Sequence, residues 1–426
     1  MPVAIVGPVL IVGAGIGGLT LALSLHQIGV AAKVYESVDR LEPLGVGINL
    51  LPHAVRELTE LGLGQSLAAT AIPTSTLAYY SKRGQPIWSE PRGLAAGYRW
   101  PQFSIHRGEL QMLLLAAVIE RLGPDSVVTG HHLGRFETGG RGVTARFVHR
   151  RTGEARGVAE GRLLIACDGI HSAVRALLVP GEGPPLWNGA LLWRGVTEAP
   201  PYLDGATMIM AGHEFQKFVC YPISREARDR GRAVLNWVAE LKFKPDHGWR
   251  REDWNRPGRL DEFLPKFESW RFDWLDIPAL IRGAPGCYEY PMVDRDPLAR
   301  WSHGPVGLLG DAAHPMYPIG SNGASQAILD ARVLTREIQA RGATPEALDA
   351  YEAERNPATA RIVLANRGNG PETVMQLVEA RAPDGYGRIE DVLSAEELES
   401  AAASYKRLAG FDRETLNARP SLVTVG

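Results

Sequence analysis

The segment VLIVGAGIGGLTLALSLHQIGVAAKVYE, residues 9–36, decides the fold. Its first four residues form a continuous apolar run, as expected of a central parallel strand that is covered on both faces. Glycines follow at once, and the apolar residues then return at helical spacing from Ile16 to Ile28. Residues 32–35 have the pattern of a second buried strand. We therefore expect a right-handed βαβ unit near the start of the chain.

The glycine turn inside this unit predicts dinucleotide binding. Gly13 permits the tight turn, Gly15 lets the backbone approach a pyrophosphate, and Gly18 lets the helix pack against the strand. The start of the helix at Ile16 offers free N–H groups and partial positive charge to the phosphates. At the end of the second strand, the Glu36 carboxylate can accept hydrogen bonds from ribose hydroxyls. This pattern fits NAD and FAD equally well.

A second motif favours the flavin. Asp311 follows the apolar run 306–309 and precedes the glycine-rich loop 318–323, which opens another helix. A carboxylate at that place can hold a ribityl hydroxyl. The helix start directs partial positive charge toward the loop, which suits the negative charge of a reduced flavin around N1 and O2. The alternative is an ordinary strand end followed by a helix cap.

A third strand end carries Asp168, directly after the apolar run 163–166. Ligands of open parallel sheets lie beyond the carboxyl ends of the strands, so the three strand ends predict one shared site. An aspartate at this place could equally cap the helix that follows it.

The composition indicates an ordinary globular protein of 426 residues with 45% hydrophobic and 22% charged residues. The formal net charge is -2 and arginines are dispersed among acids, so we expect no nucleic-acid partner. Residues 1–32 contain no charged side chain and are interrupted by glycines, which argues against a signal peptide or a membrane anchor. The three cysteines have no metal-ligand spacing, so we expect a cytoplasmic protein without a metal.

The chain is long enough for two connected domains. The tryptophan-rich stretch 186–289 contains β-leaning runs and predicts a mainly β substrate domain. We expect an α/β (α+β two-domain) fold with a Rossmann-like FAD-binding domain, and the family resemblance of the segments quoted below implies that this domain is of the GR2 type. The expected FAD-binding domain comprises residues 1–75, 100–185 and 290–367, the β-rich domain comprises 76–99 and 186–289, and 368–426 form a C-terminal helical segment.

Two helices are expected after the glycine-rich loop 318–323. One begins after Asn322-Gly323 and runs toward Gly342. The other begins at Thr344-Pro345, where proline suits the first helical position, and is interrupted at Asn356-Pro357.

Seven segments carry a resemblance to a known family. The chain resembles class A flavoprotein monooxygenases of the para-hydroxybenzoate hydroxylase superfamily over nearly its whole length, and within it the enzymes that act on phenazine carboxylates. The tail after about residue 368 resembles them least. The segments are GAGIGG at 13–18, PLGVGIN at 43–49, SIHRGELQM at 104–112, ACDGIHSAVR at 166–175, WRGVTE at 193–198, YPMVDRDPL at 290–298 and LLGDAAHPMYPIGSNGASQAILDA at 308–331.

The resemblance implies bound FAD, a transient NADH or NADPH reductant, and hydroxylation of an aromatic or heteroaromatic small molecule by O2 through a flavin C4a-hydroperoxide. A phenazine carboxylate is one candidate substrate. A salicylate-type decarboxylating hydroxylase and a flavin-binding sensor without turnover are the alternatives, and monomer and homodimer are both open.

The implied cofactor contacts are Gly13, Gly15, Ile16 and Gly18 at the pyrophosphate, Glu36 at the adenosine ribose, Val128 at the adenine, Arg107 at the pyrophosphate or ribityl chain, Asp168 at the FAD and NAD(P)H side, Asp311 at the ribityl chain, Gly320, Ser321, Asn322 and Gly323 at the isoalloxazine, and also Gly47 and Ile48.

A dry cavity beside the flavin is expected to position the substrate. Arg194 could attract a carboxylate or phenolate, or could form a structural salt bridge. His314 is expected to have a structural or flavin-positioning role, and no general base is assigned. The expected pocket residues are Trp193, Arg194, Tyr221, Trp237, Met292, Pro315 and Tyr317.

Overall fold

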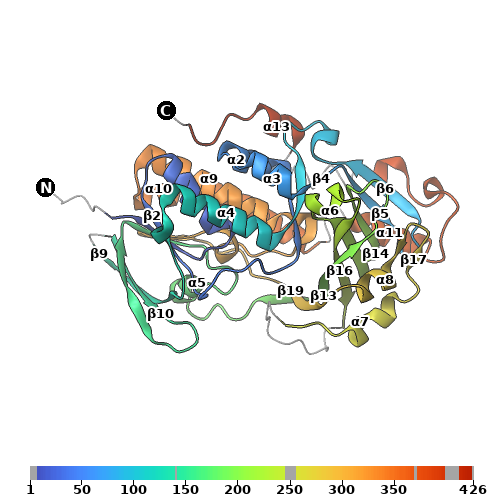
Figure 1. Ribbon diagram of the computed structural model, residues 1–426, viewed down its shortest axis with the longest axis horizontal. Helices are drawn as coiled ribbons and strands as arrows, with labels where there is room; N and C mark the ends of the chain where they lie inside the picture. Colours follow the sequence, from blue (N-terminus) through green and yellow to red (C-terminus); the bar gives the residue numbers. More distant parts are fainter. Residues whose placement is uncertain (1–6, 140–141, 245–255, 369–371, 399–411, 425–426) are drawn as a thin grey trace.

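The computed structural model describes residues 7–139, 142–244, 256–368, 372–398 and 412–424. Figure 1 shows a parallel sheet with its helices on one side of the molecule and a large sheet on the other. The two halves contact each other directly, for example where the Gly47 N–H donates to the Asn236 side chain at 2.7 Å.

A six-stranded sheet forms the centre of the first half, with the order β20-β21-β12-β1-β2-β8. All its pairings are parallel except that of β20 with β21 at one edge. Every residue of β1 and β12 is buried, as their apolar sequences require. The predicted βαβ unit is confirmed: helix α1 (Ile16–Gln27) connects β1 to β2. The strands are β1 (Val9–Val12), β2 (Ala32–Tyr35), β8 (Val127–Val128), β12 (Leu163–Ala166), β20 (Ser302–His303) and β21 (Val306–Leu308).

Four further helices, all labelled in Figure 1, form one group with α1. They are α2 (Pro52–Glu60), α4 (Arg107–Leu122), α9 (Gly323–Arg341) and α10 (Pro345–Asn366). Helix α9 has the predicted bounds. Smaller helices α3 (Gly64–Thr70), α5 (Ala173–Leu178) and α6 (Arg225–Asp229) fill the connections.

The predicted interruption of α10 at Asn356-Pro357 is wrong, because the helix continues through Pro357. Contacts on both sides of the proline hold it in place. The Asn356 side-chain amide donates to the Leu298 carbonyl at 2.9 Å, and the Thr359 hydroxyl donates to the Arg355 carbonyl at 3.0 Å. Tertiary packing therefore overrides the local preference of proline.

A seven-stranded sheet with the order β19-β13-β16-β15-β14-β5-β6 forms the second half and confirms the expected β-rich texture. The strands β5 and β6 come from the early part of the chain and join through a parallel β14–β5 pairing. The strands are β5 (Thr76–Tyr80), β6 (Pro86–Pro91), β13 (Leu186–Ala199), β14 (Thr207–His213), β15 (Gln216–Pro222), β16 (Ala233–Lys242) and β19 (Cys287–Asp294). Since β19 runs past residue 289, it crosses the expected domain boundary.

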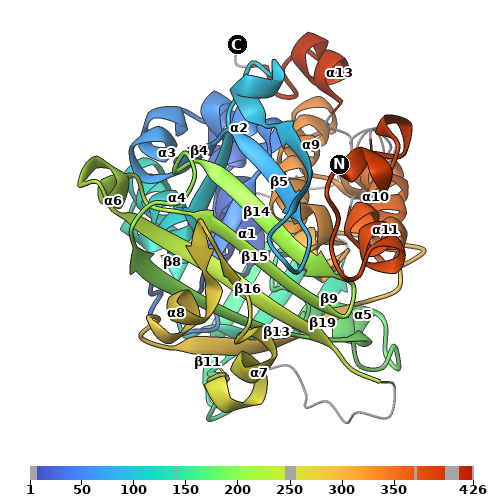
Figure 2. The same ribbon diagram turned by 90° about the vertical axis from the view of Figure 1, so that its right-hand side faces the viewer.

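Helices α7 (Leu260–Phe267) and α8 (Ile277–Arg282) cover the outer face of this sheet, in front of it in Figure 2. The opposite face looks toward the parallel sheet. Three small sheets complete the described fold: β3-β7-β4 (Gly47–Leu50, Gln102–His106, Ile72–Thr74), β11-β10-β9 (Ala155–Gly161, Gly142–Val148, His132–Gly139) and β17-β18 (Arg271–Phe272, Leu275–Asp276).

The end of the chain packs over both halves. Helix α11 (Thr373–Arg381) lies against β14, and α13 (Arg413–Ala418) is followed by Arg419, which pairs with buried Glu57 of α2. Among the described residues, no helix is both long and apolar enough to span a membrane.

Candidate functional site

Four neighbouring strands bring polar groups to one edge of the parallel sheet. Gly13 follows β1, Glu36 follows β2, Asp168 follows β12, and Asp311 follows β21. Because these strands are parallel, their carboxyl ends lie side by side. The Ala14 N–H donates to the Glu36 carboxylate at 2.8 Å, which ties the glycine turn to β2.

The glycine turn has the shape that a pyrophosphate site needs. At Gly13 φ is 104°, and a Cβ there would lie 2.4 Å from the Cys167 carbonyl oxygen. A Cβ on Gly18 would lie 2.1 Å from the Gly13 carbonyl oxygen. Gly15 differs, because its nearest neighbour would be 4.0 Å from a Cβ. Gly13 and Gly18 are thus required by the turn itself, whereas Gly15 leaves the helix N-terminus open to a ligand.

Asp168 caps helix α5, which was the alternative interpretation of this residue. Its carboxylate accepts the Ala173 N–H at 2.8 Å, and burial raises the pKa of the carboxyl to about 6. A contact between Asp168 and a cofactor stays a prediction.

A buried arginine holds the loop that follows β21. The Arg175 guanidinium donates to the carbonyls of Ala312 at 3.0 Å and Ala313 at 2.8 Å. It also pairs with the Glu182 carboxylate, which Arg295 contacts at 3.0 Å. Arg175 therefore joins the segment that follows β12 to the loop that follows β21.

His314 has a structural partner. Its Nε2 lies 2.5 Å from the Asp330 carboxylate of α9, which also accepts from Arg355 at 2.7 Å and from the Gly310 N–H at 3.1 Å. Burial opposes ionisation of Asp330, but His314 and Arg355 hold its pKa at about 2. This network supports the expected positioning role of His314.

Asp330 gives a pH prediction. Its pKa in the folded protein lies below the ordinary value of 3.8, so the ionised carboxylate contributes stability that is present above the unfolded pKa and is lost as the pH falls toward 2. The shift corresponds to about 2 kcal/mol. In urea unfolding, the free energy of unfolding of the wild type exceeds that of Asp330→Asn, and this difference should decrease by about that amount from pH 6 to pH 2.5. A difference that is constant with pH would contradict this.

Asp311 lies at the floor of a cavity between the two halves. Its side chain reaches solvent, yet surrounding protein atoms raise the pKa of the carboxyl, while His314 and Arg107 oppose that rise. The same cavity brings together residues from β3 and from the loop before α9: Gly47, Ile48, Ser321, Asn322 and Gly323. Gly320 adjoins them, with φ at 68°. Val128 lies elsewhere, where its carbonyl accepts the Glu36 N–H at 2.8 Å.

The inner face of the large sheet forms the cavity wall. Of the predicted pocket residues, Arg194, Tyr221 and Met292 line it. The prediction is wrong for Trp193 and Trp237, which alternate to the outer face of their strands: Trp193 stacks on Phe263 with ring centroids 4.8 Å apart.

Pro315 and Tyr317 are buried on either side of Met316, which lines the cavity. Tyr317 packs in the same apolar cluster as the lining residues Met210 and Met292, so a substrate contact of Pro315 or Tyr317 stays a prediction. Sequence reasoning missed several lining residues, including three charged ones. The missed residues are Asn49, Leu192, Met208, Met210, Lys217, Val219, Val238, Glu240, Met316, Pro318, Ile319, Ala324 and Glu372.

Arg194 stands out within this wall. Its guanidinium donates to the Gly47 carbonyl at 2.8 Å, and the Tyr221 hydroxyl donates to the same oxygen at 2.9 Å. The Arg194 Nε is buried and has no hydrogen-bond partner among the described residues. Burial raises the pKa of Tyr221 to about 12, so its phenol stays protonated. The arrangement presents a cation in the wall of the cavity that Asp311 and the loop before α9 also line.

Comparisons with known proteins agree with this architecture. A family model described as "FAD binding domain" matches residues 7–228 and 292–366. The chain is 48% identical to the phenazine 1,6-dicarboxylic acid hydroxylase of Lysobacter antibioticus, over 84% of this chain and 89% of that protein. It is 33% identical to the aurachin C monooxygenase/isomerase of Stigmatella aurantiaca, over 82% and 84% of the two chains.

Solved structures show the same fold. A complex of Klebsiella pneumoniae HpxO with FAD and uric acid aligns with a TM-score of 0.68 and 26% identity, over 94% of this chain and 92% of that one. A salicylate hydroxylase substrate complex aligns with a TM-score of 0.71 and 22% identity, over 98% and 99% of the two chains.

The chain therefore belongs to this FAD-binding family, and it is an FAD-dependent aromatic monooxygenase with NAD(P)H as reductant. The residues present fit the cofactor. The turn at Gly13 excludes side chains, Gly15 leaves room for phosphate, and Asp311 supplies an acceptor in the lining of the cavity between the two halves.

Proposed function

We propose that the protein hydroxylates an aromatic carboxylate, with a phenazine carboxylate as the first candidate. The observation that carries this proposal is Arg194, a cation without a carboxylate partner among the described residues, in the wall of a largely apolar cavity. The relative from Lysobacter antibioticus, which is named for a phenazine dicarboxylic acid, supports the same class of substrate.

We propose that FAD lies across the edge where the strands end. Gly15 and the start of α1 would hold its pyrophosphate, Glu36 its adenosine ribose, and Asp311 its ribityl chain. Arg107 begins α4, next to the Gly45 turn, and its charge acts on Asp311. When bound, the flavin supplies the redox chemistry that activates O2.

The residues of the chain orient the substrate and keep water away. The sheet wall offers Val219, Val238 and Met210, which present apolar surface to a planar ring system. Arg194 would pair with the substrate carboxylate and set which edge of the ring faces the loop before α9. A fixed orientation in a dry cavity is what oxygen transfer to a ring carbon requires.

Replacement of Arg194 by glutamine tests this proposal. A charge-assisted hydrogen bond contributes roughly 1.5–3 kcal/mol, so KM for phenazine-1-carboxylate should rise about 10- to 100-fold. Binding of uncharged phenazine should change little. The measurement is NAD(P)H oxidation by the holoenzyme together with mass spectrometry of the product, which also distinguishes plain from decarboxylating hydroxylation.

The matched control is Arg232→Gln. Arg232 directly precedes β16 of the same sheet and contacts Glu198 at 3.3 Å, away from the cavity. The Arg232→Gln variant should have an unchanged KM. If Arg194→Gln has the same KM as this control, Arg194 does not bind the substrate carboxylate.

A further inference from the structure

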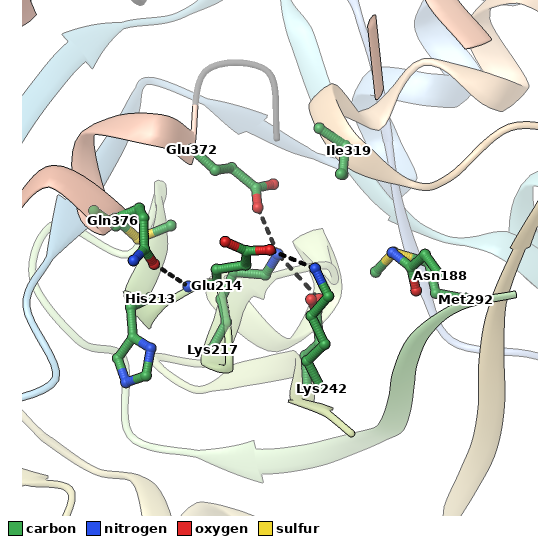
Figure 3. A pocket seen from close by; sticks show the side chains of 11 residues that line it. Asn188, His213, Glu214, Lys217, Lys242, Met292, Ile319, Glu372 and Gln376 are labelled. Carbon is green, nitrogen blue, oxygen red and sulfur yellow. Dashed lines mark hydrogen bonds and ion pairs between the residues drawn. The ribbon is translucent and has the colours of Figure 1, made fainter. Parts of the chain in front are cut away.

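A second charged group lies in the wall of the same cavity, away from Arg194. The Lys217 ammonium on β15 contacts the Glu240 carboxylate of β16 at 3.0 Å and the Glu372 carboxylate, just before α11, at 2.5 Å. All three side chains are less than a tenth exposed, and all three line the cavity. Figure 3 shows the Lys217 ammonium directed at Glu372. We refer to these three residues as the distal cluster.

The sheet register separates the distal cluster from the Arg194 end. Lys217 pairs with Glu240 across β15 and β16, Val219 pairs with Val238, and Tyr221 follows on the same face. At ~3.4 Å per residue, Lys217 and Tyr221 are ~14 Å apart along the strand. Arg194 itself pairs with Val238 in the middle of this wall, and its guanidinium reaches the Tyr221 end, where both side chains donate to the Gly47 carbonyl. The wall is therefore polar at the distal cluster and at the Arg194 guanidinium, with Val219 and Val238 between them.

The distal cluster has more negative than positive charge. Two carboxylates face one ammonium, and the adjacent pair of Lys242 with Glu214 adds no net charge. His213 beside them has a lowered pKa, mainly because of burial, and adds no cation at neutral pH. Burial raises the pKa of Glu240, Lys217 opposes that rise, and Glu372 adds to it.

This charge balance determines what can bind there. A second carboxylate on the substrate would face two buried carboxylates at short range, which is costly where water is scarce. An amino, hydroxyl or ring N–H group can instead donate to Glu240 or Glu372. A buried acceptor that recognises such a donor also discriminates strongly against analogues that lack it.

We propose that Lys217, Glu240 and Glu372 determine substrate specificity: they bind a hydrogen-bond-donating substituent at the end of the substrate away from Arg194, and they exclude a second carboxylate there. This inference rests on the proposed function, because it takes the Arg194 end as the site of the first carboxylate. It predicts a preference opposite to the dicarboxylic acid for which the Lysobacter antibioticus relative is named.

The test uses the oxidised holoenzyme without reductant and measures Kd from changes in the flavin absorbance. The ligands are phenazine-1-carboxylates with hydrogen, an amino group or a carboxylate at C6. The wild type should bind the 6-amino compound tightest and the 6-carboxylate at least about tenfold more weakly, given one unbalanced charge at short range. In Glu372→Gln and Glu240→Gln, the affinity for the 6-carboxylate should rise about tenfold relative to the affinity for the 6-amino compound.

The matched control is Glu379→Gln. Glu379 pairs with Lys82 at 2.5 Å and ties the same helix α11 to the β5–β6 hairpin, but it does not line the cavity. Its ligand preference should equal that of the wild type. The inference is overturned if the wild type binds the 6-carboxylate as tightly as the 6-amino compound, or if both cavity variants keep the wild-type ratio.

A second ligand series separates this inference from the proposed function. It consists of 1-naphthoate with hydrogen, an amino group or a carboxylate at C5. If the phenazines fail to bind while the naphthoates show the predicted order and the predicted response to Glu372→Gln, the phenazine proposal fails and the distal cluster remains supported. If neither series binds, both proposals fail.

Discussion

Replacement of Asp311 by alanine is expected to weaken FAD binding about 10- to 100-fold, because a buried hydrogen bond to a charged acceptor contributes roughly 1.5–3 kcal/mol. Weaker FAD binding by this variant can be distinguished from misfolding of the variant. Desolvation raises the pKa of the Asp311 carboxyl, so the ionised group is held at some cost to the folded protein. Its removal should therefore leave the stability of the flavin-free protein unchanged or slightly higher.

The measurement is a flavin titration followed by fluorescence, with thermal unfolding of the flavin-free protein alongside it. Asp330→Asn serves as the contrasting variant, since Asp330 belongs to a network with His314 and Arg355. That variant should lower stability, whereas Asp311→Ala should lower only flavin affinity. Wild-type flavin affinity in Asp311→Ala would remove the assignment of this carboxylate to the ribityl chain.

The sequence predicted the flavin side of the molecule well, for a physical reason. A central parallel strand must be apolar throughout, as β1 and β12 are, and the turn after it must contain glycine where a Cβ would meet backbone. These requirements are local, so residues 9–36 display them directly. The convergence of Asp168 and Asp311 followed from the rule for parallel sheets. Their contacts with FAD, like the domain boundaries, stay predictions.

The substrate side was predicted less well, because the side chains of a strand alternate between two faces. Trp193 and Arg194 are adjacent in sequence, yet one packs under α7 and the other lines the cavity. Burial on both faces of β13 and β16 erases the polar and apolar alternation that would have told them apart. A charged residue inside an apolar strand, such as Lys217 or Glu240, was the available signal.

Some features depend on parts of the chain that are distant in sequence, so no local pattern predicts which residues meet. Lys217, Glu240 and Glu372 are far apart in sequence, and only the register of β15 with β16 and the path of the C-terminal segment bring them together. The continuation of α10 through Pro357 likewise depends on contacts with residues such as Leu298.

Two glycines of the same motif are expected to respond differently to alanine. A Cβ on Gly18 would lie 2.1 Å from the Gly13 carbonyl oxygen and 3.2 Å from the Cys167 side chain, and backbone cannot yield cheaply. Gly18→Ala should therefore lower the free energy of unfolding of the flavin-free protein by about 1–3 kcal/mol or more. Denaturant unfolding measures this directly.

Gly15→Ala should have the opposite profile. Its backbone, with φ at -74°, is accessible to alanine, and the nearest atom to the new Cβ would be 4.0 Å away. The flavin-free protein should thus unfold within about 1 kcal/mol of the wild type, the cost of alanine at a helix N-cap. The added methyl group would stand where the pyrophosphate must approach the start of α1, so the purified variant should lack bound FAD. A stable Gly15→Ala protein that retains full flavin would place the pyrophosphate elsewhere. If Gly15→Ala is destabilised while Gly18→Ala is stable but lacks FAD, each glycine has the role assigned here to the other.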